Sequence, residues 1–134
     1  MTRKQRKHES GFTLVELMVV MIIIGVLMSF AVPRFTAAIR ASQESVLKED
    51  LSVMRMAIDS YTMDKQKGPG SLDDLVTEGY LRAIPVDPMT HVNSTWATEQ
   101  GDALHSLDQT DPGIDDVHSG SDEAGSDGVT YNTW

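Results

Sequence analysis

An apolar run near the N-terminus constrains this chain more than any other feature. It extends from Phe12 to Val32, 21 residues in which Thr13, Glu16 and Ser29 are plainly polar and Glu16 is the single charge. As an α-helix rising about 1.5 Å per residue, the run would span roughly 30 Å, the thickness of a bilayer's hydrocarbon core. Four basic residues precede it: Arg3, Lys4, Arg6 and Lys7. Positive charge before an apolar segment predicts a cytoplasmic N-terminus and a translocated remainder.

Glu16 is the unusual residue of this segment. An ionised carboxylate inside a membrane helix costs about 3 kcal/mol or more, and a residue kept at that cost usually has a partner. The next positive charge along the chain is Arg34, too far along the helix to neutralise it. We therefore expect the partner on another molecule, and a free amino group made by cleavage just before Phe12 would serve.

The stretch Gly11-Phe12-Thr13-Leu14-Val15-Glu16, followed by an apolar run, resembles the signal of type IV pilins and type II secretion pseudopilins. The resemblance implies that a prepilin peptidase cuts after Gly11 and N-methylates Phe12. It also implies that Glu16 pairs with the terminal amine of a neighbouring subunit during assembly. An ordinary secretory signal peptide would place small residues after the run, and Ser29-Phe30-Ala31 fits that poorly. A plain membrane anchor is the other alternative, and it leaves Glu16 unexplained.

The sequence divides into four segments. Residues 1–11 are predicted to be a cytoplasmic leader, 12–33 a transmembrane and assembly helix, 34–67 the amphipathic half of the same helix, and 68–134 a loop and a small β head. Pro33 lacks an amide donor and is predicted to kink or loosen the helix. The expected fold class is α+β: a pilin-like long helix whose second half packs against a small antiparallel sheet.

The second half of the helix carries one narrow apolar stripe. Leu47, Leu51, Met54, Ile58 and Tyr61 are spaced by four, three, four and three residues, the period of an α-helix with one buried face. We expect this face to pack on the head, and a coiled coil is the alternative. The sequence Gly-Pro-Gly at 68–70 then predicts the end of the helix.

The sequence after the long helix predicts short elements of secondary structure. Ser71 suits the N-cap of a short helix that ends at Gly79, and the surrounding 69–88 stretch resembles the αβ-loop of the major pseudopilins, the G subunits of type II secretion. Residues 94–98, 114–119 and 129–134 are predicted strands. Trp134 is predicted to fill the core.

Charge is distributed very unevenly. The net charge is −9, and removal of the leader, with four basic residues and one acidic residue, would bring it to −12. No Lys or Arg follows Arg82, whereas ten Asp and Glu do. Such a surface repels nucleic acid phosphates, so no nucleic acid partner is expected. The chain has no Cys, so a head this small needs a metal, packing between subunits, or both.

The acidic stretch 115–128 is the candidate metal site. Asp-rich loops with glycines collect the oxygen ligands that calcium prefers, although the spacing does not fit an EF-hand. A flexible acidic loop is the alternative. The stretch also resembles the calcium loop of the G pseudopilins, which implies Asp116 and Asp122 as ligands, with Asp127 as a further candidate.

These observations predict a structural subunit that polymerises with copies of itself into a type II secretion pseudopilus. A type IV pilin for adhesion, motility or DNA uptake is the alternative, and a membrane-anchored calcium module that never polymerises is another. The resemblance implies minor pseudopilins, a prepilin peptidase and an inner-membrane assembly platform as partners. It also implies a single-pass bacterial inner-membrane protein with a periplasmic C-terminus. No enzyme motif is present, and the proximity of Ser119, His118 and Asp116 is more typical of a loop than of a triad.

Overall fold

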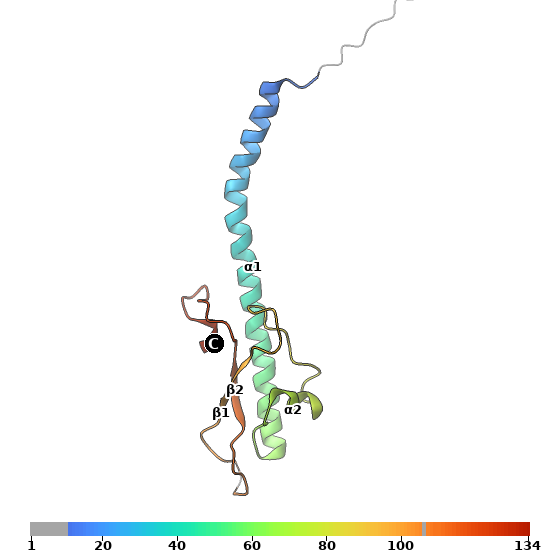
Figure 1. Ribbon diagram of the computed structural model, residues 1–134, viewed down its shortest axis with the longest axis vertical. Helices are drawn as coiled ribbons and strands as arrows, with labels where there is room; N and C mark the ends of the chain where they lie inside the picture. Colours follow the sequence, from blue (N-terminus) through green and yellow to red (C-terminus); the bar gives the residue numbers. More distant parts are fainter. Residues whose placement is uncertain (1–10, 106) are drawn as a thin grey trace, which may run out of the picture. The chain divides into compact units, whose positions relative to one another are not determined.

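A computed structural model describes residues 11–105 and 107–134 of the chain. Its elements are the 52-residue helix α1 (Leu14–Lys65), the short helix α2 (Leu72–Thr77), the strands β1 (Ala97–Gln100) and β2 (Ile114–His118), and the 3-10 helix η1 (Tyr131–Thr133) (Figure 1). The chain forms two compact units, one up to Ala38 and one from Ile39 to Trp134. The second unit is called the head below.

In the first unit, every described residue is exposed. Helix α1 contains an 18-residue window with a mean hydropathy of 2.7, none of it buried, and is long and apolar enough to cross a membrane. The helix continues through Pro33 without interruption, so Pro33 does not end it, and the kink stays a prediction. The hydroxyl groups of Ser29 and Thr36 donate to the carbonyls of Gly25 and Pro33, which satisfies these polar groups within the helix.

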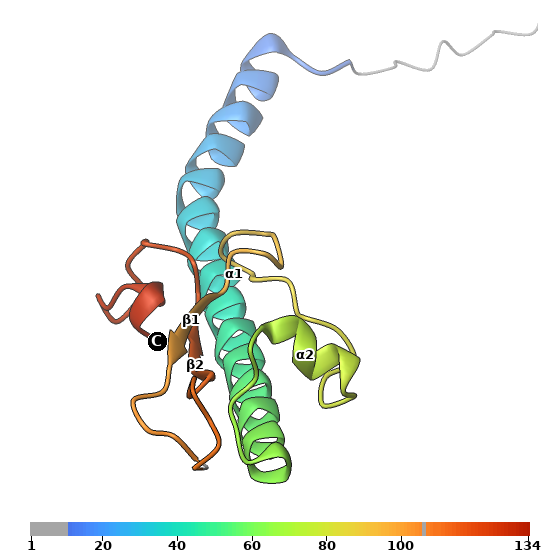
Figure 2. The ribbon, with the colours of Figure 1, turned by 60° about the horizontal axis from the view of Figure 1, so that its bottom comes forward.

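The head is built on the predicted apolar stripe of α1. Leu47, Leu51, Met54, Ile58 and Tyr61 are all buried, which confirms packing on the head. Figure 2 shows α2 and the two strands alongside this half of the helix. The core is completed by residues from these segments: Leu75, Leu81, Trp96, Ile114, Val117 and Tyr131. Full burial of a leucine side chain contributes roughly 1.5–3 kcal/mol, so burial of this stripe stabilises the head.

Backbone hydrogen bonds connect the turn after α1 to the segment at the start of β2. Gln66 takes a left-handed conformation (φ 55°), and the amide of Gly68 donates to the carbonyl of Pro112 at 3.1 Å. The amide of Ile114 donates back to the carbonyl of Pro69 at 2.8 Å. A Cβ on Gly68 would lie 2.6 Å from the oxygen of Pro112, so the close crossing requires glycine there.

Helix α2 begins and ends as the sequence predicted. Ser71 is its N-cap residue, and the Asp74 carboxylate accepts hydrogen bonds from the amides of Gly70 and Ser71. Gly79 follows the helix with a φ of 83°, a conformation that glycine adopts without a steric penalty.

The sheet is smaller than predicted. Strands β1 and β2 pair antiparallel, with Ala97 opposite His118 and an irregularity at Glu99–Gln100, so the first strand begins three residues later than expected. The predicted third strand at 129–134 is wrong: this stretch makes one isolated bridge, Ala124 with Thr130, and then turns into η1. The α+β class is nevertheless confirmed.

Where the third strand was expected, Tyr131 is fully buried and the backbone forms the turn of η1. Trp134 is half-buried rather than a complete core plug. Its ring packs edge-on against Tyr131 at 5.0 Å, and the ammonium of Lys48 lies 4.6 Å from its ring centre.

Candidate functional site

The predicted processing site lies at the start of α1. Residues 1–10 of the predicted leader are outside the described residues, whereas Gly11 and Phe12 precede the helix and are exposed. Phe12 is 85% exposed, so nothing in the described chain protects this bond or its aromatic side chain. Cleavage between Gly11 and Phe12, and methylation of Phe12, stay predictions.

Glu16 lies in the first turn of α1, where a negative charge is favoured by the helix dipole. Its amide donates to the hydroxyl of Thr13 at 3.2 Å, which makes Thr13 a side-chain cap that the sequence interpretation missed. A Thr with a Glu three positions later is the signal that could have found it. Within residues 11–105 and 107–134, no hydrogen bond or ion pair to the Glu16 carboxylate is seen.

The three predicted calcium ligands are held in separate ways. Asp116 on β2 accepts from the Arg55 guanidinium at 2.6 Å and from the Val117 amide at 2.7 Å. Partial burial opposes ionisation of Asp116, but these two hydrogen bonds and the charge of Arg55 outweigh it and lower its pKa. Asp122 accepts from the Asn132 amide group at 2.9 Å, and Asp127 accepts from the Val129 backbone amide at 3.0 Å.

This arrangement does not match a preformed calcium site. Among the described residues, no three Asp, Glu, His or Cys side chains are grouped so that they could hold a metal ion. Asp116 already has a cationic partner, Arg55, which would have to be displaced before Asp116 could bind a divalent ion. Asp122 and Asp127 are both exposed and lie on the same loop. Calcium binding therefore stays a prediction.

A buried carboxylate on α1 fastens the acidic loop to the helix. Glu44 is 6% exposed, and its Oε1 accepts from the Ser126 amide at 2.7 Å and from the Tyr131 hydroxyl at 2.8 Å. Its Oε2 accepts from the Ser126 hydroxyl at 2.6 Å. The hydrogen bonds from Ser126, followed by those from Tyr131, lower the pKa of Glu44 despite its burial.

Arg40 completes this cluster, which we call the Glu44 clamp: Arg40, Glu44, Ser126 and Tyr131. Its Nε donates to the Tyr131 hydroxyl at 3.2 Å and lies 3.7 Å from the Glu44 carboxylate, and its guanidinium also contacts the Ala124 carbonyl. The sequence interpretation missed this site. The signal was available, since Glu44 lies three residues before Leu47, on the same helical face as the apolar stripe.

A second group of bonds holds the C-terminal segment. Arg55 also donates to the carbonyls of Val117 at 3.0 Å and Trp134 at 2.6 Å, and the His118 Nδ1 lies 2.6 Å from the same Trp134 oxygen. Arg55 thus connects α1, β2 and the last residue. Together with the Glu44 clamp, it joins the acidic loop to the helix at both of the loop's ends.

No hydrolytic triad exists among Asp116, His118 and Ser119. The Ser119 side chain is fully buried and its hydroxyl donates to the Asp87 carboxylate at 2.6 Å, so it does not face His118 as a nucleophile would. Asp87 is itself fully buried and accepts from the Met89 amide at 2.8 Å. This pair links the 85–92 loop to the loop after β2.

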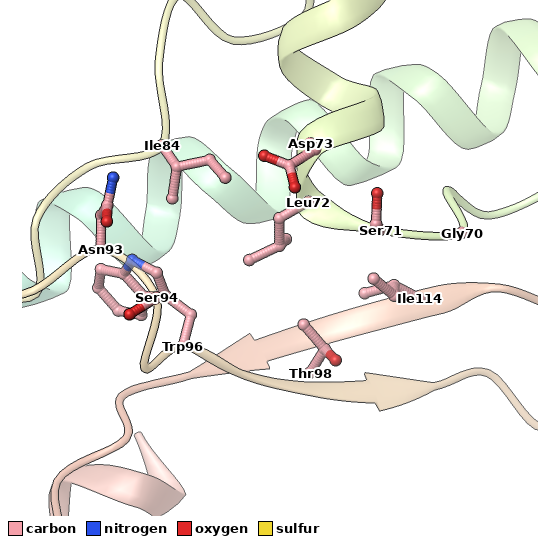
Figure 3. A pocket seen from close by; sticks show the side chains of 10 residues that line it. All are labelled: Gly70, Ser71, Leu72, Asp73, Ile84, Asn93, Ser94, Trp96, Thr98 and Ile114. Carbon is pink, nitrogen blue, oxygen red and sulfur yellow. The ribbon is translucent and has the colours of Figure 1, made fainter.

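The head also carries a pocket of about 420 Å³ beside α2 and β1 (Figure 3). Its walls are formed by Gly70, Ser71, Leu72, Asp73, Ile84, Asn93, Ser94, Trp96, Thr98 and Ile114. Asp73 is the single ionisable side chain among these lining residues, so the pocket offers no acid–base pair. The Trp96 indole donates to the Pro85 carbonyl at 2.8 Å and is therefore fixed in the wall.

Comparison with known proteins first identifies the class of protein to which this chain belongs. Residues 6–32 match the prokaryotic N-terminal methylation motif, the segment that contains Gly11, Phe12 and Glu16. With this motif, an apolar N-terminal helix and an α+β head, the chain is a pilin-like protein with a single-pass membrane anchor.

The relatives narrow the class. The chain is 34% identical over 100 residues to the type II secretion system core protein G of Pseudomonas aeruginosa, covering 63% of this chain and 70% of that one. It is 34% identical over 103 residues to the Escherichia coli K12 protein of the same name, covering 65% and 68%. A competence protein, ComGC of Halalkalibacterium halodurans, is 32% identical over 79 residues, covering 59% and 78%. No solved structure matched. The chain belongs to the family of type II secretion system core protein G, the pseudopilins.

Proposed function

We propose that this chain is the structural subunit of a type II secretion pseudopilus and drives protein export by polymerising through its N-terminal helix. One observation carries the proposal. The methylation motif ends with the first part of α1, residues 14–32, which is apolar on every side and holds one charge, Glu16, with no partner seen in the described chain. A membrane helix that keeps such a charge is supplied with its counterion from elsewhere.

The proposed maturation follows from the same residues. A prepilin peptidase cuts after Gly11 and N-methylates Phe12, which leaves a cationic amine at the new N-terminus. Glu16 of one subunit then pairs with that amine on its neighbour. The basic leader favours a cytoplasmic N-terminus and a periplasmic head. The expected partners are minor pseudopilins and the inner-membrane assembly platform.

A type IV pilin is the second candidate function, and one observation favours it: the match to a competence protein. Deletion and complementation of the gene separate the two. Lost secretion of folded exoproteins with intact twitching and DNA uptake supports the pseudopilus. Intact secretion with lost motility or DNA uptake would replace it with the pilin.

Two further points belong to this proposal. We propose that the chain has no enzymatic role, which is supported by its relatives, core proteins of a secretion system. Calcium binding at the acidic loop is a separate proposal, supported by the exposed Asp122 and Asp127 and by the resemblance of the loop to that of the G pseudopilins. A calcium titration followed by calorimetry tests it, with magnesium as the control. Equal or absent heats for the two ions would reject it.

A further inference from the structure

The pocket beside α2 and β1 has the size of a ligand site and walls that the fold holds in place. Its volume of about 420 Å³ lies within the range of about 300–1,000 Å³ that is typical of small-molecule pockets. The indole of Trp96 donates to the carbonyl of Pro85 at 2.8 Å, and the backbone amide of Ile114 donates to the carbonyl of Pro69 at 2.8 Å. The pocket is therefore formed before any ligand arrives.

The pocket has apolar side chains on both of its sides. Leu72 and Ile84 are half-buried, whereas Trp96 and Ile114 are buried. Figure 3 shows Leu72 on the side of α2, with Thr98 and Ile114 on the side of the strands, extending toward one another across the pocket. Such a lining favours the alkyl part of a ligand, because apolar groups gain free energy when they leave water.

The polar side chains of the pocket are not used by the fold. Among residues 11–105 and 107–134, no hydrogen bond or ion pair is seen to the carboxylate of Asp73 or to the side chains of Asn93 and Ser94. The neighbouring Asp74 differs, because its carboxylate accepts two backbone amide hydrogen bonds at the start of α2. The carboxylate of Asp73 makes no such bond within the described chain and is available to pair with a ligand.

The charge of the pocket selects a cationic ligand. Asp73 is the single ionisable side chain among the lining residues, and no Lys or Arg follows Arg82 in the chain. A ligand with a carboxylate or phosphate would therefore be repelled. A calcium ion takes about six to eight oxygen ligands, and this pocket offers a single carboxylate. An amine on an alkyl stem suits the pocket, since such a stem lies along apolar surface while its charged end stays near water.

We propose that this pocket binds a primary alkylammonium group, a charged amine on an apolar stem, as in a lysine side chain or a diamine. The stem lies between Leu72 and the strands, and the ammonium pairs with the carboxylate of Asp73. An ammonium has three donors, and the side-chain oxygens of Asn93 and Ser94 are further acceptors in the same pocket. The site goes beyond the proposed function, and its failure would leave the proposed polymerisation untouched.

A titration of the full chain in detergent micelles, followed by 1H–15N NMR, tests the site. The lysine probe is N-acetyl-lysine N-methylamide, and the diamine probe is 1,5-diaminopentane. Saturable shifts at the amides of Leu72, Asp73 and Asn93 are expected, and the tighter of the two probes identifies the source of the amine as a protein side chain or a free diamine. The absence of shifts, shifts spread over the acidic stretch 115–128, or equal binding of the uncharged N-acetyl-norleucine N-methylamide would overturn the proposal.

Asp73→Asn isolates the charge of the pocket. It should weaken binding of the lysine probe about three- to fivefold, the effect of losing an exposed ion pair, and should reduce the salt dependence of binding. Asp102→Asn is the matched control, because it removes the same charge from an exposed residue outside the pocket and should retain the affinity. Equal affinity of Asp73→Asn and the parent would overturn the proposal. Equal weakening in the two variants would do the same, since the net charge of the head would then attract the amine.

Thr98→Trp tests the cavity separately. Thr98 is exposed on β1 and lines the pocket, and aromatic residues are well suited to strands. The larger side chain fills the space opposite Leu72 and should abolish the shifts, although Asp73 is unchanged. Retained binding would mean that charge alone holds the amine at the surface, and it would reject the pocket as the site. The amide spectrum of each variant verifies that the head remains folded.

Discussion

Glu16 and Glu44 lie on the same helix, but their carboxylates differ in burial and in hydrogen bonding. Glu44 is nearly buried and receives three hydrogen bonds, two from Ser126 and one from Tyr131. Glu16 lies among exposed apolar side chains, and no partner for its carboxylate is seen in the part of the chain that the structure describes. A buried or membrane-embedded carboxylate is costly unless it is paired. One of the two is therefore satisfied by folding, and we infer that the other is satisfied by assembly.

The helix segments around the two glutamates differ in the same way. From residue 14 to 38 the apolar side chains point in every direction and none is buried. From residue 44 to 61 a single stripe is buried and the remaining faces are exposed. Apolar content alone does not separate a segment that packs within its own chain from one that packs on other molecules. The periodicity of the apolar residues does.

The largest effect is expected at Glu16. Glu16→Ala should reduce filament yield on the order of 100-fold, because it leaves the neighbour's cationic amine without a counterion in the membrane, at a cost of about 3 kcal/mol. The unfolding midpoint of the head should stay unchanged, since no bond from Glu16 to the described residues of the head is seen. Shear and pelleting measure the filaments, and urea unfolding measures the head. A destabilised head in this variant would break the contrast with Glu44.

The next largest effect is expected at Tyr131, which is fully buried and touches the clamp. Tyr131→Ala should lower the free energy of unfolding by about 3–5 kcal/mol, through the cavity and the lost hydrogen bond to Glu44. Urea unfolding of the detergent-solubilised chain, followed by tryptophan fluorescence, measures this. A loss below about 1 kcal/mol would show that η1 is not part of the core.

The clamp also predicts a pH dependence. Because the pKa of Glu44 in the folded head lies below its value of roughly 4.3 in an unfolded chain, its stabilisation is complete above the unfolded pKa. It is lost as the pH falls through the folded pKa. The lowered pKa of Asp116 acts in the same direction.

The variant Glu44→Gln isolates this contribution. It should cost about 1–3 kcal/mol at neutral pH, because the Gln amide cannot accept all three hydrogen bonds. It should also flatten the loss of stability between neutral and acidic pH, measured as urea midpoints at each pH. If the variant and the parent lose the same stability on acidification, carboxylates other than Glu44 account for the pH dependence.

The smallest effect is expected at Lys48, whose ammonium lies over the Trp134 ring at 4.6 Å. Lys48→Ala should lower the free energy of unfolding by about 0.5–1 kcal/mol, the range for exposed cation–π pairs. Lys48→Arg should retain most of it, because a guanidinium stacks on the same ring. A larger effect from Lys48→Ala would mean that contacts outside the buried stripe of α1 contribute more to head stability than their exposure suggests.

Much of the fold could be predicted because local patterns determine it. The spacing of Leu47, Leu51, Met54, Ile58 and Tyr61 identified the buried stripe, and Ser71 and Gly79 marked both ends of α2. The strand at 129–134 was predicted wrongly, since a short segment with alternating apolar residues has the same pattern whether it forms a strand or a turn of 3-10 helix. The position of β1 was also shifted, because all four of its residues are exposed and give no periodic signal.

The candidate functional residues could be predicted where a single residue stands out from its local sequence. Glu16 is noticeable because it is the only charge in an apolar run. The Glu44 clamp joins residues more than 80 positions apart, and the Arg55–Asp116 pair joins residues 61 apart. The local sequence does not indicate which carboxylate will form a hydrogen bond or ion pair with an arginine or serine that is distant in the chain. The composition of the acidic stretch therefore predicted a set of metal ligands. It did not indicate that one of them, Asp116, forms an ion pair with Arg55.

The state of the N-terminus tests the central claim most directly. Protein is purified from its native membrane, and the N-terminal peptide is identified by mass spectrometry. A peptide that begins with N-methylated Phe12 is the predicted result, since it supplies the cationic amine that Glu16 requires. A mature protein that still begins at Met1, or one cut after the apolar run, would contradict the account.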